Sequence, residues 1–377
     1  MTNNGTREST YMIKIAPLLA PALVLALTGC SLAPQYQRPE MELPQAWDAT
    51  SSIAIQTRWW ERFHDDTLNA LVEEALANNR NIAQAMASVR QAQAALGMAR
   101  DALLPVPSAA ANGARTMARD ASSPTALQHG GRNTNAFSGS LSASWTLDFW
   151  GKYWNASESA RASLVATEAA RDNVILTVAA STVESWFWLS AYTWQEEIAE
   201  SVLKNREDSL VLYQNRFDNG QISEYDLLSI RANVETARNA LASARIAKNA
   251  AETSLAVLLG RSPAEIMKKN NLKAPSSLMT SLPTTPALPS DLPSRLLEQR
   301  PDIRQAEANL QAANFDIGVA RAEFFPSFSL TGLLGSASLE LNELLRGANA
   351  YSALSGGLSL PPNFWTIERG VDSAQAA

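Results

Sequence analysis

Residues with reactive side chains are few in this chain and lie far apart. Its 377 residues include one cysteine, Cys30, and two histidines, His64 and His129, which stand in unrelated contexts. A single cysteine excludes an internal disulfide, a cysteine-based zinc site and a pair of redox thiols. The sequence contains no G-x-S-x-G, no H-E-x-x-H, no P-loop and no G-x-G-x-x-G after a strand. We therefore expect a protein that is not an enzyme, with no metal site and no cofactor.

Acylation is the chemistry that the position of Cys30 favours. An apolar run from Ile15 to Leu27 precedes Thr28-Gly29-Cys30. The run is too short for a permanent membrane helix and is typical of a signal peptide, here residues 1–29. Small residues just before a cysteine resemble a bacterial lipobox, in which cleavage leaves the cysteine first, with lipid on its thiol and amine. The residue after the cysteine is Ser31 and not Asp, which resembles the pattern of lipoproteins sent to the outer membrane. Several acyl chains on one residue anchor a protein firmly. The alternative is an ordinary buried thiol.

The composition limits the classes of partner. Hydrophobic residues make up 46% of the chain and charged residues 18%, so the chain is not of the disordered type. The net charge is −6 and there is no block of Lys or Arg. A protein whose main partner is nucleic acid needs a basic face, so nucleic acid is not expected as a partner.

Two stretches of the chain are copies of one another. Asn79–Pro105 and Arg300–Pro326 align without a gap, so that Asn79 stands against Arg300 and Pro105 against Pro326. Each copy is a helical pattern that ends on a proline and is followed by polar and apolar residues in alternation. An offset that stays constant from the first position to the last indicates a duplicated module.

The alternating stretches predict strands long enough for a membrane. From Phe137 to Phe149 every second residue is apolar or glycine, and the residues between are Ser, Thr or Asp. Such a run suits a membrane strand of ~9–11 residues, whereas an edge strand of a soluble sandwich is the alternative. The second copy alternates in the same way over 327–334 and 354–360. A cluster that we assign to a membrane aromatic girdle stands at the end of the first run: Trp145, Trp150, Tyr153 and Trp154.

Between the copies the sequence predicts a long helical hairpin. No glycine or proline occurs from Lys152 to Asn219 or from Gln221 to Leu259, so Gly220 is the single break. A helix of some 65 residues reaches on the order of 100 Å, far more than a compact domain uses. The return helix carries apolar residues at alternating steps of 3 and 4, which is a heptad seam. These are Leu227, Ile230, Val234, Ala237, Leu241 and Ala244.

Four strands cannot close a membrane barrel, because single-chain barrels begin at about eight strands. An open sheet edge in lipid leaves backbone groups without partners. If the strands lie in a membrane, several chains must therefore share one barrel.

The order of these segments resembles the TolC-like outer-membrane factors of tripartite efflux pumps, and most of all their lipoprotein branch. The motifs that carry the resemblance are LTGCSLAPQYQRP (27–39), LDFWGK (147–152), RFDNGQISEYDLL (216–228) and QRPDIRQAEANLQAANFDIGVARAEFFPSFSLTG (299–332). The resemblance implies a mixed, internally duplicated fold. Four strands per chain join the shared barrel of a homotrimer, and the helical hairpin forms a periplasmic α-barrel. It implies an outer-membrane channel subunit that conducts drugs or other solutes.

The resemblance also implies the partners and the docking residues. A periplasmic adaptor would meet the hairpin tip and link it to an inner-membrane pump, while outer-membrane lipid surrounds the strands. The tip residues carried over are Asn219, Gly220, Gln221, Ser223, Asp226 and Leu227. The alternative function is a lipid-anchored periplasmic coiled-coil adaptor or scaffold. The substrate does not follow from the sequence, since conduits of this kind are chosen by their pump partners. A metal substrate is not claimed, since the methionines are scattered and isolated methionines usually serve packing.

The segments expected along the chain follow from this order. They are a signal peptide (1–29), a lipidated extended arm (30–57), first-copy helices (58–105), a first membrane β-hairpin (106–150), the long periplasmic hairpin (151–260), a connecting equatorial segment (261–293), second-copy helices (294–326), a second membrane β-hairpin (327–361) and the start of a second helical hairpin (362–377). The family usually continues into a full second hairpin, whereas this sequence stops at Ala377. We expect a C-terminally truncated member that lacks the gate residues and does not conduct on its own.

Overall fold

The computed structural model describes residues 32–39, 58–116, 134–267 and 299–377. The chain divides into two compact units. We call the first the strand unit (Met1–Glu40, Gln91–Ala166 and Ala306–Ala377) and the second the helix unit (Met41–Arg90 and Thr167–Gln305). Each unit is described by itself.

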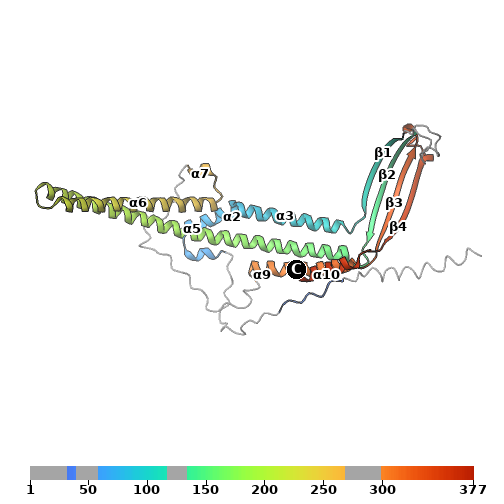
Figure 1. Ribbon diagram of the computed structural model, residues 1–377, viewed down its shortest axis with the longest axis horizontal. Helices are drawn as coiled ribbons and strands as arrows, with labels where there is room; N and C mark the ends of the chain where they lie inside the picture. The colour runs from blue at the N-terminus through green and yellow to red at the C-terminus, as the bar shows by residue number, and fades with distance from the viewer. Residues whose placement is uncertain (1–31, 40–57, 117–133, 268–298) are drawn as a thin grey trace, which may run out of the picture. The chain divides into compact units, whose positions relative to one another are not determined.

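The strand unit contains one antiparallel sheet (Figure 1). Its strands are β1 (Val106–Thr116), β2 (Thr134–Leu147), β3 (Ser327–Ser338) and β4 (Ala350–Ser359), in the order β1-β2-β3-β4. The two predicted strand pairs are therefore present, and β2 of the first copy pairs with β3 of the second.

Strand β2 ends two residues earlier than the alternation predicts. Asp148 and Phe149 lie outside it, because the chain turns there into the next helix. The Asp148 carboxylate accepts a hydrogen bond from the Trp154 backbone N–H at 2.8 Å, and Gly151 adopts a φ of 71°. A carboxylate on an N–H of the first helical turn satisfies a donor that has no partner within the helix.

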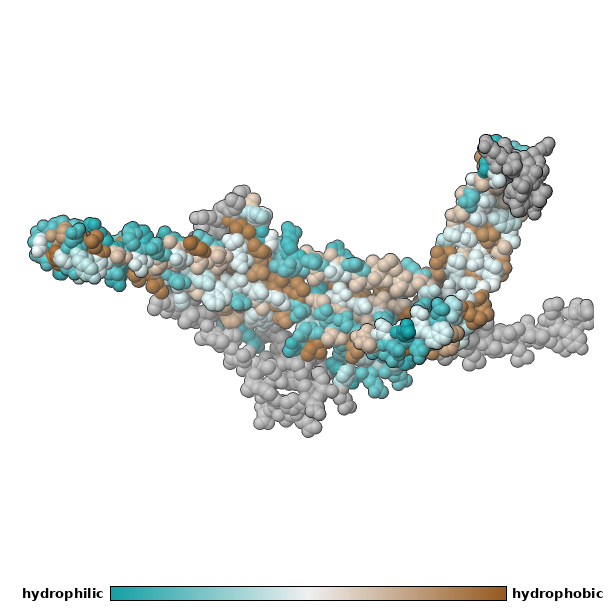
Figure 2. Space-filling model, viewed as in Figure 1, coloured by the Kyte–Doolittle hydropathy of each residue, from teal (hydrophilic) through white to brown (hydrophobic). Residues whose placement is uncertain are grey.

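The two faces of the sheet differ in chemistry. On one face Trp145 lies opposite Leu330, and Leu147 lies opposite Phe328. On the other face hydroxyl groups gather, and the Ser108 and Ser142 hydroxyl oxygens are 2.6 Å apart. Teal, the colour of hydrophilic residues, is scarce along the strands in Figure 2. An apolar face against a hydroxyl face is the pattern of a strand that separates lipid from a polar lumen.

The strand unit also contains helices, which meet the strands at one end of the sheet (Figure 1). They are the unit's parts of α3 (Arg80–Asp101), α5 (Lys152–Asp218) and α9 (Pro301–Ala322), together with α10 (Phe364–Ala376). Small residues of α9 are buried, among them Ala312, Gly318 and Ala322. The sequence shared by the two copies thus forms α3 before β1 and α9 before β3.

The helix unit holds the hydrophobic core. It contains η1 (Trp59–Phe63), α2 (Asp66–Asn78), α6 (Glu224–Leu258), α7 (Pro263–Met267) and most of α5. Asp65 connects these elements: one carboxylate oxygen caps α2, and the other accepts a 2.9 Å hydrogen bond from the Trp186 indole. The residues buried around this link are Trp60, Leu68, Leu71, Val72, Val178, Trp186, Leu189, Leu255 and Leu259.

Helices α5 and α6 pair along the predicted seam. Leu227, Val234, Ala237, Leu241 and Ala244 are buried, and Ile230 is partly buried. Ion pairs cross beside the seam, from Arg245 to Glu196 at 3.0 Å and from Lys248 to Glu196 at 2.9 Å. At 67 residues, α5 is a single helix of about 100 Å.

The helix unit closes where α6 ends. Gly260 adopts a φ of 71°, and Arg261 forms a two-point ion pair with Glu74 at 2.9 and 3.0 Å. The Asn79 side chain donates to the Leu258 carbonyl at 2.7 Å and caps the first turn of α3. The segment expected to connect the copies, 261–293, begins here with α7, and its residues from 268 onward lie outside the described part.

Candidate functional site

Aromatic residues join the two copies at the base of the sheet. The Trp150 indole donates a 2.8 Å hydrogen bond to the carbonyl of Pro326, the proline that follows α9. The same indole stacks on Phe325 with centroids 4.5 Å apart, and Phe149 meets Phe328 edge-on at 5.2 Å. We call this set of contacts the internal junction. Stacked and edge-on pairs at these distances each stabilise by about 0.5–1.5 kcal/mol beyond their burial.

The other predicted girdle residues lie close by in the chain. Trp145 stands on the apolar face of β2, 38% exposed, and its indole donates to the Leu103 carbonyl at 2.9 Å. Tyr153 and Trp154 open α5, where Trp154 is 55% exposed and Tyr153 is partly buried. An exposed Trp or Tyr ring at the end of an apolar strand face suits the membrane–water interface.

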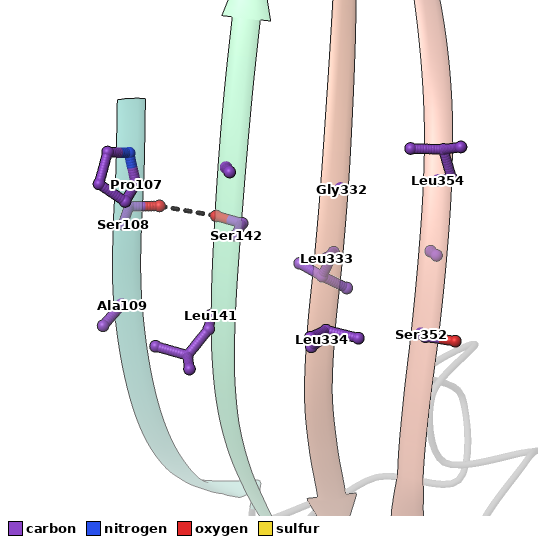
Figure 3. A pocket seen from close by; sticks show the side chains of 12 residues that line it. Pro107, Ser108, Ala109, Leu141, Ser142, Gly332, Leu333, Leu334, Ser352 and Leu354 are labelled. Carbon is purple, nitrogen blue, oxygen red and sulfur yellow. Dashed lines mark hydrogen bonds between the residues drawn. The ribbon is translucent and has the colours of Figure 1, made fainter. Parts of the chain in front are cut away.

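The sheet carries a hollow of about 760 Å³ (Figure 3). Leu141, Leu334 and Leu354 line it, with the Ser108–Ser142 hydroxyl pair at one side. Small residues such as Gly332 between the leucines leave this space open. Its lining has no charged side chain.

Residues 32–39, the described part of the predicted arm, lie along α9. The Arg321 guanidinium donates to the Leu32 carbonyl at 3.3 Å, and the Asn314 amide donates to the Pro34 carbonyl at 2.8 Å. Farther along, Arg38 pairs with Glu307 at 3.0 Å. Glu307, Asn314 and Arg321 follow one another at two helical turns, which places the three side chains on one face of the helix.

Gly318 lets the arm lie close to this face. A Cβ built on Gly318 would come within 2.9 Å of the Ala33 Cβ and 2.7 Å of the Asn155 amide nitrogen. Real Cβ atoms do not come this close to other atoms, and the Ala33 backbone nitrogen also lies at 2.9 Å. The close approach of the arm to α9 therefore depends on glycine at position 318. Tyr36 lies beside Glu307, and burial, followed by the Glu307 charge, raises the pKa of its phenol.

The face of α9 that holds the arm is only partly repeated in α3. In the alignment of the copies, Gly318 and Arg321 correspond to Gly97 and Arg100. Glu307 corresponds to Met86, which has no charge to pair with Arg38. This difference is visible in the alignment, but the arm contact that gives it meaning is visible only in the structure.

The tip of the helical hairpin is a tight turn with a built-in cap. Gly220 has a φ of 67°, and its N–H donates to the Phe217 carbonyl at 2.8 Å. Ser223 and Asp226 form a capping box at the start of α6. The hydrogen bonds from Ser223 lower the pKa of the Asp226 carboxyl, which keeps it ionised at the positive end of the helix dipole.

The predicted tip residues differ in what they offer to a partner. Asn219, Gly220 and Gln221 are exposed, whereas Leu227 is only 3% exposed and packs in the seam between the helices. Two further residues of the tip are exposed and apolar: Tyr225, 80% exposed, and Leu228, 52% exposed. Both lie within the motif RFDNGQISEYDLL (216–228) that carries the resemblance, although neither is among the individually predicted tip residues.

Cys30, the predicted lipid-anchor residue, lies outside the described residues, as do residues 40–57 of the arm. Among the residues that the structure does describe, no group of three His, Cys, Asp or Glu side chains is placed to hold a metal ion.

The fold and these surfaces define a class of outer-membrane channel protein. The family model described as outer membrane efflux protein matches residues 71–261 and 292–370. This chain belongs to that family.

Curated relatives and solved structures agree with the assignment. The chain is 33% identical over 339 residues to the cation efflux system protein CusC of Escherichia coli O6:H1, covering 88% of this chain and 70% of that protein. It is 31% identical over 353 residues to the toluene efflux pump outer membrane protein TtgC of Pseudomonas putida, covering 89% and 69%. The crystal structure of the CmeC outer membrane channel of Campylobacter jejuni superposes with a TM-score of 0.81 at 28% identity, over 92% of this chain and 74% of that one.

Proposed function

We propose that copies of this chain assemble into the trimeric outer-membrane channel component of a tripartite efflux system. The observation that carries the proposal is the four-stranded sheet, with strands of 10 to 14 residues, one apolar face and one hydroxyl face. Among the described residues, β1 and β4 pair on one side only. Open edges cannot persist in lipid, so strands from other copies must cover them. Three copies of four strands give a barrel of twelve.

The proposed partners are assigned to two surfaces of the chain, the apolar face of the strands and the tip of the helical hairpin. Membrane lipid surrounds the apolar strand face, and the exposed tip around Gly220 is the surface for a periplasmic adaptor, with Gln221, Tyr225 and Leu228 as contact residues. The adaptor in turn links the channel to an inner-membrane pump that supplies the energy. The names of the relatives span cations and toluene, so we place the choice of solute in the pump and not in this chain.

The lipid anchor is a further part of the proposal. Cys30 precedes Leu32 by two positions, and the Leu32 carbonyl is bonded to Arg321 at the end of α9 that leads into β3. A lipid on Cys30 would therefore enter the membrane beside the strands of its own chain. This arrangement supports an outer-membrane lipoprotein.

The experiment that tests the channel is an unheated denaturing gel of isolated outer membranes. We expect a heat-labile band near three times the chain mass of 40.7 kDa. The same sample after boiling is the control and should run as a monomer. A chain that is present in the outer-membrane fraction but runs only as a monomer on the unheated gel would favour the alternative of a lipid-anchored adaptor or scaffold.

The tip assignment has its own test. Tyr225→Ala and Leu228→Ala remove exposed apolar surface without touching the seam, so the trimer band should persist while cross-linking to the adaptor falls. Ile198→Ala, an exposed apolar position on α5 far from the turn, is the matched control. Unchanged cross-linking in both tip variants would move the docking surface elsewhere.

A further inference from the structure

The two copies repeat their strand pairing as well as their sequence. Within the first hairpin, Val106 lies opposite Ser144. Within the second, Ser327 lies opposite Ser359. The difference in residue number between Val106 and Ser327 equals that between Asn79 and Arg300 in the aligned helices, and we call it the helix offset. The difference in residue number between Ser144 and Ser359 is a different one, and we call it the strand offset. The two hairpins therefore have the same register, with β1 equivalent to β3 and β2 equivalent to β4.

A sequence motif gives the strand offset independently. Phe149-Trp150 follows β2, and Phe364-Trp365 follows β4 at the same step along the chain. Because the motif and the hydrogen-bonded register agree, Trp365 is the equivalent of Trp150. The helix offset makes Pro105 the equivalent of Pro326 and Leu104 the equivalent of Phe325.

One of the two edges at which these aromatic residues lie, the edge between β2 and β3, is already paired within the chain. At the internal junction β2 pairs with β3, and Trp150 reaches Phe325 and the Pro326 carbonyl. The equivalent groups stand at the outer edges of the sheet. Trp365 is 78% exposed, whereas Trp150 is partly buried, and Leu104 is 59% exposed. A large exposed indole whose equivalent is held by a specific contact is suited to the same contact with another copy of the chain.

We propose that β4 of one copy pairs with β1 of the neighbouring copy in the register of the internal junction. In each pair of β2 with β3, adding the strand offset to the β2 residue gives its equivalent in β4, and subtracting the helix offset from the β3 residue gives its equivalent in β1. The two equivalents are the residues that lie opposite each other across the boundary between copies. Ser359 then lies opposite Ala110 of the neighbouring copy, Leu358 opposite its Ala111, and Gly356 opposite its Gly113. The inference rests on the proposed shared barrel and goes beyond it by fixing the strand register.

The same transfer places Trp365. Its ring packs on Leu104 of the neighbouring copy, and its indole N–H donates to the carbonyl of that copy's Pro105. The contact closes each subunit boundary as Trp150 closes the boundary between the copies.

The chemistry of the faces agrees with this register. Leu358 and Ala111 both belong to the apolar face, and Ser359 and Ala110 both belong to the hydroxyl face. A slip of one position would place an apolar face beside a hydroxyl face across the boundary. A slip of two positions keeps the faces and has to be distinguished by experiment.

Cysteine pairs on the hydroxyl face test the register. Ser359→Cys with Ala110→Cys should link neighbouring copies on mild oxidation in outer membranes, giving covalent dimers and trimers on a boiled gel. The slipped pairs, Ser359→Cys with Ser108→Cys or with Asn112→Cys, are the matched controls. Diagonal neighbours are ~7–8 Å apart, too far for a disulfide, so they should not link. Ser144→Cys with Thr331→Cys, the equivalent pair inside one chain, shows that the oxidant reaches this level.

Each result decides the proposal. Linking at a slipped pair instead of the predicted pair overturns the register and leaves the shared barrel in place. No link at any pair between copies, although the internal pair links and the unheated trimer band is present, overturns the pairing of β4 with β1. Loss of the trimer band as well removes the shared barrel on which the inference rests.

A double-mutant cycle tests the Trp365 contact. Trp365→Ala and Leu104→Ala should each lower the temperature at which the trimer dissociates, measured by loss of the trimer band on the gel. The double variant should dissociate at the same temperature as the less stable of the two single variants. Additive shifts would show that the two side chains do not meet. Tyr225→Ala, an exposed residue at the tip of the helical hairpin, is the control and should leave the temperature unchanged.

Discussion

Two glycines with left-handed backbone conformations, Gly220 and Gly260, differ in the space around their Cα atoms. Gly220 at the hairpin tip has a φ of 67° and open space where a Cβ would stand. Gly260 at the end of α6 has a φ of 71°, and a Cβ there would overlap the carbonyl oxygen of Asn78. The first glycine serves the turn alone, whereas the second also permits a close approach of two segments.

We expect Gly260→Ala to destabilise the protein more than Gly220→Ala. Both changes impose the left-handed strain of about 1–2 kcal/mol on an L residue. Only Gly260→Ala adds a clash with backbone that cannot move aside. Thermal unfolding followed by far-UV circular dichroism compares the two variants, and equal losses would mean that the segment at Asn78 yields easily.

A carboxylate between two cations makes the hairpin sensitive to pH. The hydrogen bond from Lys248, followed by that from Arg245, holds the pKa of Glu196 below its ordinary value of 4.5. The stabilisation is therefore present above pH 4.5 and is lost as the pH falls through the lowered pKa.

Glu196→Gln should lower the melting temperature near neutral pH, by an amount that corresponds to at most about 1 kcal/mol. The difference from the unchanged protein should vanish at a pH well below 4.5, where Glu196 is itself protonated. Glu200→Gln removes a single, more exposed ion pair and should have a smaller effect. A difference that persists in acid would assign the loss to packing instead of charge.

At the scale of elements, the arm and α9 form a specific pair. Three residues on one face of α9 hold the arm: Glu307, Asn314 and Arg321. Helix α3 repeats the glycine and the arginine of this face but carries Met86 in place of Glu307. The duplicated helices have thus diverged at a position where, in α9, the side chain pairs with the described part of the arm.

Glu307→Met, which copies the α3 residue into α9, should release the arm near Arg38. Chymotrypsin should then cleave after Tyr36 faster than in the unchanged protein, because the ion pair and the neighbouring phenol contact are both lost. Met86→Glu on α3 is the control and should leave cleavage unchanged. Equal cleavage rates in all three proteins would show that the backbone bonds of Asn314 and Arg321 suffice.

At the scale of the whole molecule, duplication explains why one chain carries two strand pairs and long helices between them. Each copy contributes a helix, a proline and a strand pair, and β2 with β3 joins the copies into one sheet. The family assignment covers both copies, residues 71–261 and 292–370. A sheet that is continuous across the copies is a ready segment of a larger ring.

Replacing the proposed anchor should change where the molecule resides. Cys30→Ala removes the acylated thiol, so fatty-acid labelling should disappear and the share of the chain in outer membranes should fall. Cys30→Ser gives the same loss of thiol with nearly the same side-chain volume and should behave alike. Unchanged labelling in both variants would contradict the lipobox interpretation.

The sequence by itself determined the elements of this protein. Periodicity of two predicted the strands and the 3–4 spacing predicted the buried seam, because these periods follow from backbone geometry that is local to each segment. The absence of glycine and proline around Gly220 predicted the hairpin for the same reason. The motif resemblance indicated the family that the comparisons then showed.

Contacts between distant segments were decided only by the tertiary structure. The arm's choice of α9 depends on Arg38 meeting Glu307, which lies 269 positions along the chain. Trp150 was expected in the girdle, and the structure adds a hydrogen bond from its indole to the carbonyl of Pro326 in the second copy. Side chains reach these partners only after the chain has folded, so no local pattern in the sequence encodes them.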